Sequence, residues 1–596
     1  MVNLETHPNP SIHSDELREN ASSWANDFRR GLAFMEDRQP VDSNLVNLPR
    51  RKAADPTKAA LAHTIAQIVY PEMGESSLGP IIRYEKDLVK LRAYIHAQRK
   101  EDATLHSSST WTNRLLRCGP WDEENDPLSL EGTPSLPMPV QISDGETLAP
   151  FFHHLRIGGD DHILEGEDAN AEEKQEPFYN THMVEFPKGV LYADRRMDLC
   201  KMVVGPTHIG DLMDSLETNP FTEHFLLGNN IIGPLGAKCI AAFVNKYPNR
   251  MKTWYLAGNC IDGPGFTILV DSLTKSSSVT NIWLKRNPLG PSAAYDVFRL
   301  ITQAPNLRTL DLDQTSLGDA GVASLFNSLA DYKSNTPLAL QHIYLNGAGI
   351  GQDGAKAIAR YLSTDSCTLV SLYASNNPLG DKGAKALAVG SSSNKSLQRL
   401  ALSSVGLKDH GVCELLTSLQ KHSSLRLLDL GQSFATDDLG MRYNWLTDAV
   451  IPGLLSLIKN VPTLRYLALD HAPMTRVGLN QIFTAVIESN LLYFSARALE
   501  PQGRDYHSVK AGQTAVRLKE LVAKRLAENV AKEHNGMSLD DFYADGKRFL
   551  ISPEDVRYID SVYRNRDAGL ARRGLKRLDK WWKEGDDTLD LVQNAI

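Results

Sequence analysis

Residues 279–289 read VTNIWLKRNPL. Apolar residues stand at the first, fourth, sixth and last positions of this stretch, and Asn287 stands two residues before its end. Side chains of a strand alternate between its two faces, so Ile282 and Leu284 face one side and Trp283 faces the other. A short amide side chain such as that of Asn287 bonds well to backbone groups where a chain turns. The stretch therefore predicts a short strand that ends in a turn fixed by asparagine.

The same pattern recurs along the middle of the chain. Most copies are 28 or 29 residues apart, two intervals are 33 and 39 residues long, and the position of Asn287 is taken by Asn230, Asn259, Asn287, Thr315, Ala348, Asn377, Val405, Asn444 and Ala472. Each copy continues into apolar residues at helical spacing, as Ala384, Leu387 and Ala388 show in NPLGDKGAKALAVG at 377–390. One strand and one helix cannot bury their apolar faces alone, so the copies must stack as a solenoid.

This repeat resembles the ribonuclease-inhibitor-like leucine-rich repeat family, which includes the Ran GTPase-activating protein and the repeat domains of intracellular immune sensors. The resemblance covers residues 197–500, about half of the chain. It implies an α/β solenoid with a curved parallel sheet on the concave side and helices outside. It implies no single function, because one fold supports many.

Four regions are predicted from pattern and composition. They are a helical N-terminal region (1–120), an acidic flexible linker (121–185), the solenoid with its N-terminal cap (186–500) and a helical C-terminal cap (501–596). Residues 122–135 and 158–178 are rich in acidic residues, and we expect them to be mobile or poorly packed. Residues 513–533 and 553–583 look helical, with Trp581 and Trp582 either packing in the cap or contacting a partner.

Composition narrows the function. The 596 residues carry a net charge of −8, so the overall field that attracts DNA or RNA is missing and no nucleic-acid partner is predicted. No apolar stretch approaches the ~18 residues of a membrane span, so no membrane partner is predicted. The first 20 residues lack the pattern of a secretory signal. Six cysteines without a C-x-x-C pair are typical of a reduced protein, and we expect a monomer in the cytoplasm or nucleus.

No catalytic motif stands out. The sequence contains no P-loop, G-x-S-x-G or H-E-x-x-H motif, and it predicts no cofactor, metal or catalytic residue. We therefore interpret the chain as a non-enzyme. The alternative is a GTPase-activating protein of the Ran regulator type, because that family uses an arginine on the loop after a repeat strand and Arg286 and Arg442 have such positions. Neither arginine has the family's threonine-glycine context. A further alternative is an accessory enzyme with an unrecognised N-terminal catalytic region.

The predicted function is binding of a protein partner, as a scaffold or regulator, through the concave face. Large aromatic rings recur at the outward strand position, and such rings are enriched at binding hot spots. The predicted binding residues on this face are Tyr255, Trp283, Lys285, Arg286, Asp311, Asp313, Tyr344, Tyr373, Asp429 and Asp470. We expect the four rings to form one accessible stripe. The alternative is that they only stack on one another for stability.

The 39-residue interval before Asn444 contains an insertion. It reads SFATDDLGMRY at 433–443 and falls between a strand and its asparagine. Such a loop projects at the edge of the concave face, and loops on rigid scaffolds often carry function. Arg442 and Tyr443 complete the predicted binding residues, with a decorative loop as the alternative.

Overall fold

The computed structural model describes two compact units, Met1–Asn113 and Arg114–Ile596. The described residues are 14–36, 56–73, 78–105, 114–133, 135, 141–159, 172–175, 181–437, 439–499, 506–545, 556–563 and 592.

The first unit is built from amphipathic helices. They are α1 (Ser14–Glu36), α2 (Pro56–Val69) and α3 (Leu78–Leu105), with a 3-10 turn η2 (Pro71–Met73) after α2. Phe28, Ile65 and Leu91 place one buried residue from each helix in a shared core. Asp87 of α3 accepts hydrogen bonds from the hydroxyl of Tyr70 at 2.8 Å and from Nε of Arg83 at 2.9 Å.

The second unit contains one sheet whose strands follow one another in sequence order from β1 to β14. The pairs from β1 to β4 are antiparallel, and every pair from β4 to β14 is parallel. The strands are β1 (Glu172–Gln175), β2 (His182–Glu185), β3 (Val190–Tyr192), β4 (Arg196–Asp198), β5 (His224–Leu226), β6 (Thr253–Tyr255), β7 (Asn281–Trp283), β8 (Thr309–Asp311), β9 (His342–Tyr344), β10 (Ser371–Tyr373), β11 (Arg399–Ala401), β12 (Leu427–Asp429), β13 (Tyr466–Ala472) and β14 (Tyr493–Ala498).

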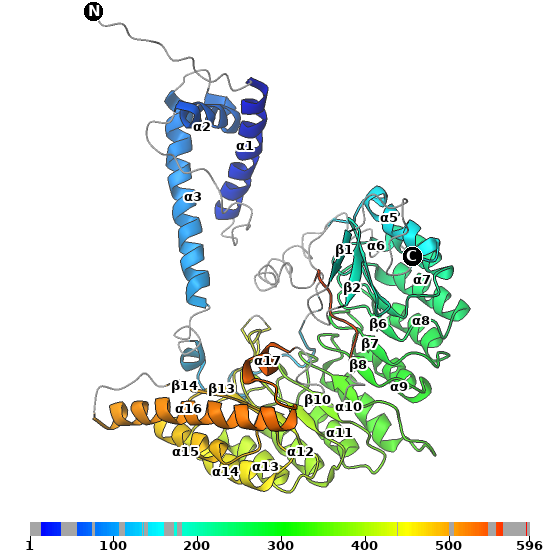
Figure 1. The fold of residues 1–596 in the computed structure, drawn as a ribbon, viewed down its shortest axis with the longest axis vertical. Coiled ribbons are helices and arrows are strands. Elements are labelled where there is room, and N and C mark those ends of the chain that lie inside the picture. The colour runs from blue at the N-terminus through cyan, green and yellow to red at the C-terminus, as the bar shows by residue number, and fades with distance from the viewer. Residues whose placement is uncertain are drawn as a thin grey trace, which may run out of the picture. The chain divides into compact units, whose positions relative to one another are not determined.

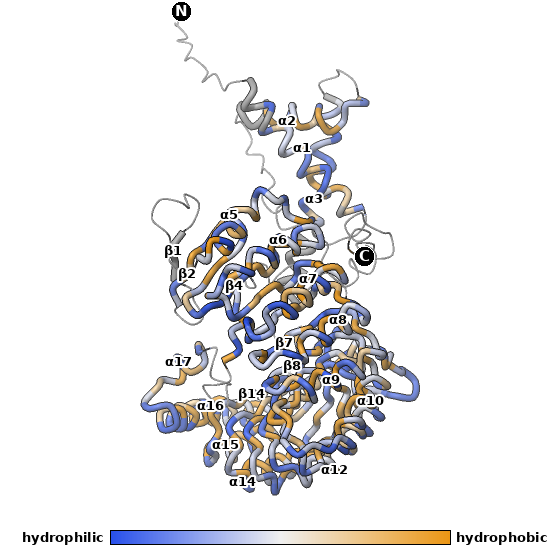
Figure 2. The backbone as a smooth tube through the Cα atoms, turned by 90° about the vertical axis from the view of Figure 1, so that its right-hand side faces the viewer, coloured by the Kyte–Doolittle hydropathy of each residue, from blue (hydrophilic) through white to orange (hydrophobic). Residues whose placement is uncertain are grey.

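Helices cover the outer face of this sheet (Figure 1). They are α5 (Gly145–Arg156), α6 (Gly205–Glu217), α7 (Gly233–Lys246), α8 (Gly263–Leu273), α9 (Ala294–Gln303), α10 (Gly318–Asp331), α11 (Gln352–Leu362), α12 (Gly380–Ser393), α13 (Asp409–Leu419), α14 (Ile451–Asn460) and α15 (Arg476–Ile487), with 3-10 turns η3 (Pro291–Ala293) and η4 (Asp448–Val450). The tube in Figure 2 alternates between apolar and polar colours along these helices, as amphipathic helices do. Leu284, Leu312 and Leu345 are buried between sheet and helices. The predicted solenoid and its register are confirmed.

Buried asparagines tie each coil to the one before it. Asn230, Asn259, Asn287, Asn377 and Asn444 each donate from Nδ2 to a leucine carbonyl of the preceding coil, at 2.8 to 2.9 Å. Oδ1 of Asn287 also accepts from the backbone N–H groups of Asn259 at 3.1 Å and Ile261 at 3.0 Å. The prediction that these amides are buried and bonded to backbone is confirmed.

In seven of the nine repeat copies, the residue before the position of Asn287 turns the chain in the left-handed region. Asn229, Gly258, Arg286, Gln314, Gly347, Asn376 and Ser404 all have φ between 51° and 69°. This conformation costs an ordinary L-residue roughly 1–2 kcal/mol, and the neighbouring hydrogen bonds between coils offset that cost. Arg286 therefore occupies a backbone turn that seven of the nine copies share, independently of its side chain.

The predicted acidic linker (121–185) is wrong for residues 121–133 and 141–159, and for residues 172–175 and 182–185, which form strands β1 and β2. Residues 121–133 pack along the loops that follow the strands. There the carbonyl of Leu130 accepts from the N–H of Asp319 at 2.8 Å, and the N–H of Thr133 donates to the carbonyl of Gly347 at 3.0 Å. Gly132, at φ 90°, lies so close to the backbone of Ala348 that a Cβ would clash. The acidic composition suggested a mobile segment, but the backbone of this segment forms hydrogen bonds with the loops and its Asp126 forms an ion pair with Arg442. Residues 160–171 and 176–178 lie outside the described residues.

Both ends of the solenoid are covered. Strands β1 to β3 and α5 extend the sheet and the helix layer before the first repeat, with Leu148 and Phe151 of α5 in the common core. At the other end, α16 (Tyr506–Glu533) packs on α15 with Leu518 and Val522 buried, and α17 (Leu539–Ala544) follows it. The helix predicted over 553–583 is wrong for residues 556–563, which contain none. Trp581 and Trp582 lie outside the described residues.

We expect Asn287→Leu to lower the free energy of unfolding by about 1–3 kcal/mol, because it leaves buried backbone groups of two coils without partners. The same substitution at Asn327, which is exposed on α10, is a matched control and should change it by less than about 0.5 kcal/mol. Urea denaturation of both variants measures the difference. Equal effects of the two substitutions would show that the buried asparagines contribute nothing specific to the free energy of unfolding.

Candidate functional site

The four predicted rings form one stripe across the concave face, the face of the sheet opposite the helices. Tyr255 pairs with Trp283 and Tyr373 with Tyr344 in the strand register. Ring centroids are 6.4 Å apart for Tyr255–Trp283, 5.2 Å for Trp283–Tyr344 and 4.2 Å for Tyr344–Tyr373, and the rings of Tyr344 and Tyr373 are stacked with nearly parallel planes, 6° apart. These four residues are called the aromatic stripe below.

The prediction that the stripe is accessible is wrong for three of its rings. Tyr255, Trp283 and Tyr344 are only 7%, 4% and 7% exposed, while Tyr373 is partly exposed. They are covered by residues 556–563, called the C-terminal strap below. Ile559, Val562 and Tyr563 of the strap belong to the same apolar cluster as the three rings.

Polar contacts also hold the strap. The guanidinium carbon of Arg557 lies 5.6 Å from the ring centroid of Trp283 and 5.2 Å from that of Tyr344, which are cation–π distances. Tyr558 stacks on His224 with centroids 4.3 Å apart. The hydroxyl of Tyr563 accepts from the N–H of Gly189 at 3.2 Å. The strap thus spans the concave face from the N-terminal cap to β9.

Beyond the strap the concave face is hollow. A cavity of about 1060 Å³ lies over the coils from β7 to β14, and the strap and the 433–443 loop contribute to its walls. We call it the open groove. Its lining includes five of the predicted binding residues: Lys285, Asp313, Tyr373, Asp429 and Asp470.

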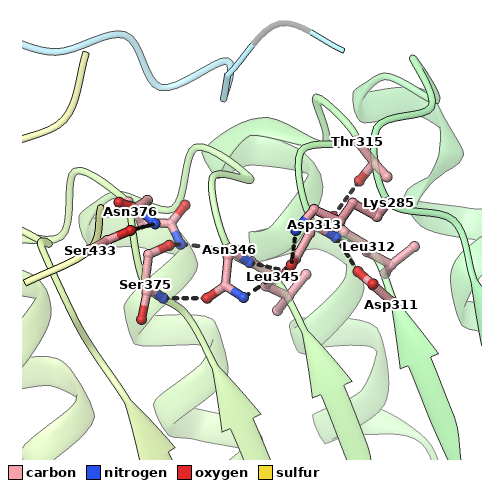
Figure 3. A network of polar contacts seen from close by, with 11 residues as sticks. Lys285, Asp311, Leu312, Asp313, Thr315, Leu345, Asn346, Ser375, Asn376 and Ser433 are labelled. Carbon is pink, nitrogen blue, oxygen red and sulfur yellow. Dashed lines mark hydrogen bonds and ion pairs between the residues drawn. The ribbon is translucent and has the colours of Figure 1, made fainter. Parts of the chain in front are cut away.

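A polar network crosses the floor of the groove from coil to coil (Figure 3). The carboxylate of Asp313 pairs with Nζ of Lys285 at 3.3 Å and accepts from the backbone N–H of Asn346 at 2.7 Å. Oδ1 of Asn346 then accepts from the N–H of Ser375 at 2.8 Å. Oγ of Ser375 accepts from the N–H of Ser403, at 3.0 Å. Each side chain positions the next, so the floor is preorganised.

Asp311 and Asp429 are among the carboxyl groups on this face whose pKa values are raised by burial, and Asp198 on β4 is another. Asp311 lies between Trp283 and Tyr344 in the register, and these two rings meet above it. Burial, helped by the charge of Asp313, raises the pKa of Asp311 to about 8. Burial also raises the pKa of Asp429, with the charge of Asp470 acting in the same direction. A cation beside either group would stabilise its ionised form.

The remaining predicted residues lie outside the open groove. Arg286 donates from Nη2 to Oδ1 of Asn229 at 2.5 Å. Arg442 forms an ion pair with Asp126, at 2.6 Å between Nη2 and Oδ2. Tyr443 is buried, so it is not available at the loop surface. The 433–443 loop instead presents Phe434, whose side chain is 73% exposed at the groove.

Sequence reasoning missed several lining residues. Ser375 and Tyr466 line the groove from repeat positions near the predicted ones, so the register contained the signal for them. Asn346 and Gln432 also line the groove, at positions that the register places on the concave face beside the predicted binding residues. The strap residues Val556, Arg557 and Ile559 had no such signal. Among the described residues there is no cluster of three or more histidine, cysteine or acidic side chains that could hold a metal ion, and no helix long and apolar enough to cross a membrane.

Comparison with known proteins identifies the repeat. A family model described as Leucine Rich repeat matches residues 303–326 and 365–388. NACHT, LRR and PYD domains-containing protein 3 of Homo sapiens is 32% identical over 226 residues, which are 37% of this chain and 21% of that protein. Ribonuclease inhibitor of Sus scrofa is 27% identical over 222 residues, 33% of this chain and 49% of the inhibitor. The chain contains leucine-rich repeats and is similar to ribonuclease inhibitor, so the predicted resemblance is confirmed.

The matches are partial. The chain spans about a fifth of the human protein and about half of the pig inhibitor. A solved structure, described as the crystal structure of the Rad7 and Elc1 complex in yeast, aligns at 12% identity and a TM-score of 0.30 over 48% of this chain and 64% of that chain.

We expect Asp311→Asn to stabilise the protein increasingly as pH rises. The folded pKa of about 8 exceeds the unfolded value of about 4, so the folded state holds this proton more tightly and loses stability between about pH 4 and pH 8. Asparagine keeps an oxygen that can accept from the N–H of Asp313 but carries no proton to lose. The gain at pH 8.5 over that at pH 5.5 should exceed about 1.4 kcal/mol, the free energy of one pKa unit.

Denaturation at the two pH values measures this gain. Asp353→Asn, at an exposed carboxylate on α11, is the control and should show no such trend. A constant difference between the Asp311 variant and the unchanged chain would contradict the shifted pKa.

Proposed function

We propose that this chain is a leucine-rich-repeat binding protein whose open groove takes an extended, cationic segment of a protein partner. The observation that carries the proposal is the groove itself. It is a preorganised cavity of about 1060 Å³ on the concave face that the chain's own strap does not fill. Solenoids use extended concave surfaces of this kind for binding.

Charge supports a cationic partner. Four acidic residues line the groove, Asp313, Asp429, Asp470 and Asp560, against the two cations Lys285 and Arg557. Lys285 already pairs with Asp313. The neighbouring Asp429 and Asp470 therefore favour an arginine or lysine, because a cation there removes the cost of keeping two carboxylates close together.

Aromatic side chains support a peptide rather than a bare ion. Tyr373 and Tyr493 line the groove as partly exposed rings, and Phe434 stands exposed at its edge. Rings beside carboxylates suit the aliphatic stem and the charged head of arginine or lysine together. The pig relative is named as an inhibitor of a ribonuclease, which supports a protein as partner.

The Ran-type alternative gains no such support. The two arginines that suggested it do not line the groove, and Arg286 and Arg442 contact Asn229 and Asp126. The accessory-enzyme alternative likewise rests on no particular arrangement of side chains. Binding remains the function that the site favours.

Site-specific photo-crosslinking tests this proposal. A benzophenone amino acid at position 434 should capture a defined protein from the source cells, and a crosslinker at Tyr295, equally exposed on α9 outside the sheet, should not. Asp429→Asn together with Asp470→Asn should reduce that capture by about tenfold, since a charged hydrogen bond contributes roughly 1.5–3 kcal/mol. Identical captures from both positions, or capture insensitive to the two substitutions, would overturn the open groove as the binding site.

A further inference from the structure

The C-terminal strap is held by side chains and not by strand pairing. Residues 556–563 form no strand, and none of the strand pairs of the described sheet includes them. Arg196 donates to the carbonyl of Asp560, and the hydroxyl of Tyr192 accepts from the N–H of Val562 at 3.2 Å. The strap therefore lies on a sheet whose strands are already paired without it, as a separate peptide ligand would.

Four side chains of the strap contact the aromatic stripe or the apolar cluster around it. Arg557 covers Trp283 and Tyr344, and Ile559, Val562 and Tyr563 enter the apolar cluster beneath. Counted from the arginine, the apolar anchors follow at two, five and six positions. This spacing is a recognition pattern that a segment of another protein can supply equally well.

The strap also leaves part of the surface unsatisfied. Nε1 of Trp283 is buried and has no hydrogen-bond acceptor among the described residues. A buried donor without an acceptor costs free energy, and native structures contain few of them. A ligand that places an acceptor beside this indole would gain a contact that the strap lacks.

We propose that the aromatic stripe is a second docking surface, that the strap is its resident occupant, and that the partner which replaces the strap is an extended protein segment with the same pattern. That segment carries an arginine, an aliphatic residue two positions later, and an aliphatic and an aromatic residue five and six positions later. This inference does not rest on the proposed function, because it concerns the covered part of the concave face and not the open groove.

A labelled peptide tests it directly. The probe is a fluorescein-labelled peptide of residues 555–564, DVRYIDSVYR, and the full chain carries Ile559→Asp and Val562→Asp to release the strap. Fluorescence anisotropy should show the peptide binding the release variant at least about tenfold more tightly than the unchanged chain, where the strap occupies the surface. A peptide with glutamate at the position of Arg557 should bind the release variant more weakly. Val516→Asp with Leu521→Asp, at exposed positions of α16, is the matched protein control and should behave like the unchanged chain.

Several outcomes would overturn the proposal. Equal peptide binding by the unchanged chain and the release variant would show that the strap does not occupy the surface. No binding by a release variant with an unchanged melting temperature would show that the stripe is packing alone. A dimer of the unchanged chain that the release variant loses, seen by light scattering, would assign the strap to a second copy.

A second measurement tests the proposal even if the release variant fails to fold, because it uses the unchanged chain. Hydrogen–deuterium exchange of the unchanged chain is followed with a large excess of unlabelled peptide. The amides of residues 556–563 should then exchange faster, because the peptide displaces the strap. Unchanged exchange in that segment would overturn the proposal.

Discussion

The hydrogen bonds of the buried asparagines fix the distance and direction between coils, and the concave face depends on them. Every strand from β4 to β12 is three residues long, so strand pairing alone offers few hydrogen bonds per coil. Nδ2 of Asn287 bonds to carbonyls of two coils while its Oδ1 receives two N–H groups. This arrangement holds the chain where it turns sharply off the sheet. Successive outward positions are thereby brought into line.

That alignment explains why the aromatic stripe packs as it does. Parallel strands lie ~4.8 Å apart, which is close to the distance at which two rings stack. Tyr344 and Tyr373 on adjacent strands stack, and Trp283 and Tyr344 lean together over the strand between them. Asp311 is enclosed as a result, and its pKa rises. Rings in such a row present one continuous apolar surface, so a covering segment gains more by lying across all of them than by contacting one.

The sequence predicted what is periodic and missed what is not. Asn287, Leu284 and the outward position of Trp283 could be placed because each recurs at a fixed interval. The ion pair of Arg442 with Asp126 and the contact of Arg557 with Trp283 join residues about 300 positions apart. No local sequence pattern predicts such contacts. The acidic composition of residues 121–133 favoured a mobile linker. Yet Gly132 packs against the backbone of Ala348, and the carbonyl of Leu130 accepts a hydrogen bond from the N–H of Asp319, so this segment lies against the loops.

The two long-range segments cover different parts of the solenoid. Residues 121–133 lie against the loops that follow the strands, and the strap covers the concave face as far as β9. The described residues leave uncovered the stretch from Asp313 to Asp470, where carboxylates, hydroxyls and amides line the groove beside the remaining rings. An apolar row needs a permanent or exchangeable cover in water, whereas a polar floor whose groups bond to one another does not. The chain covers the part of its concave face that is costly to leave in water. The described residues leave the preorganised polar groove open, as the proposed binding site requires.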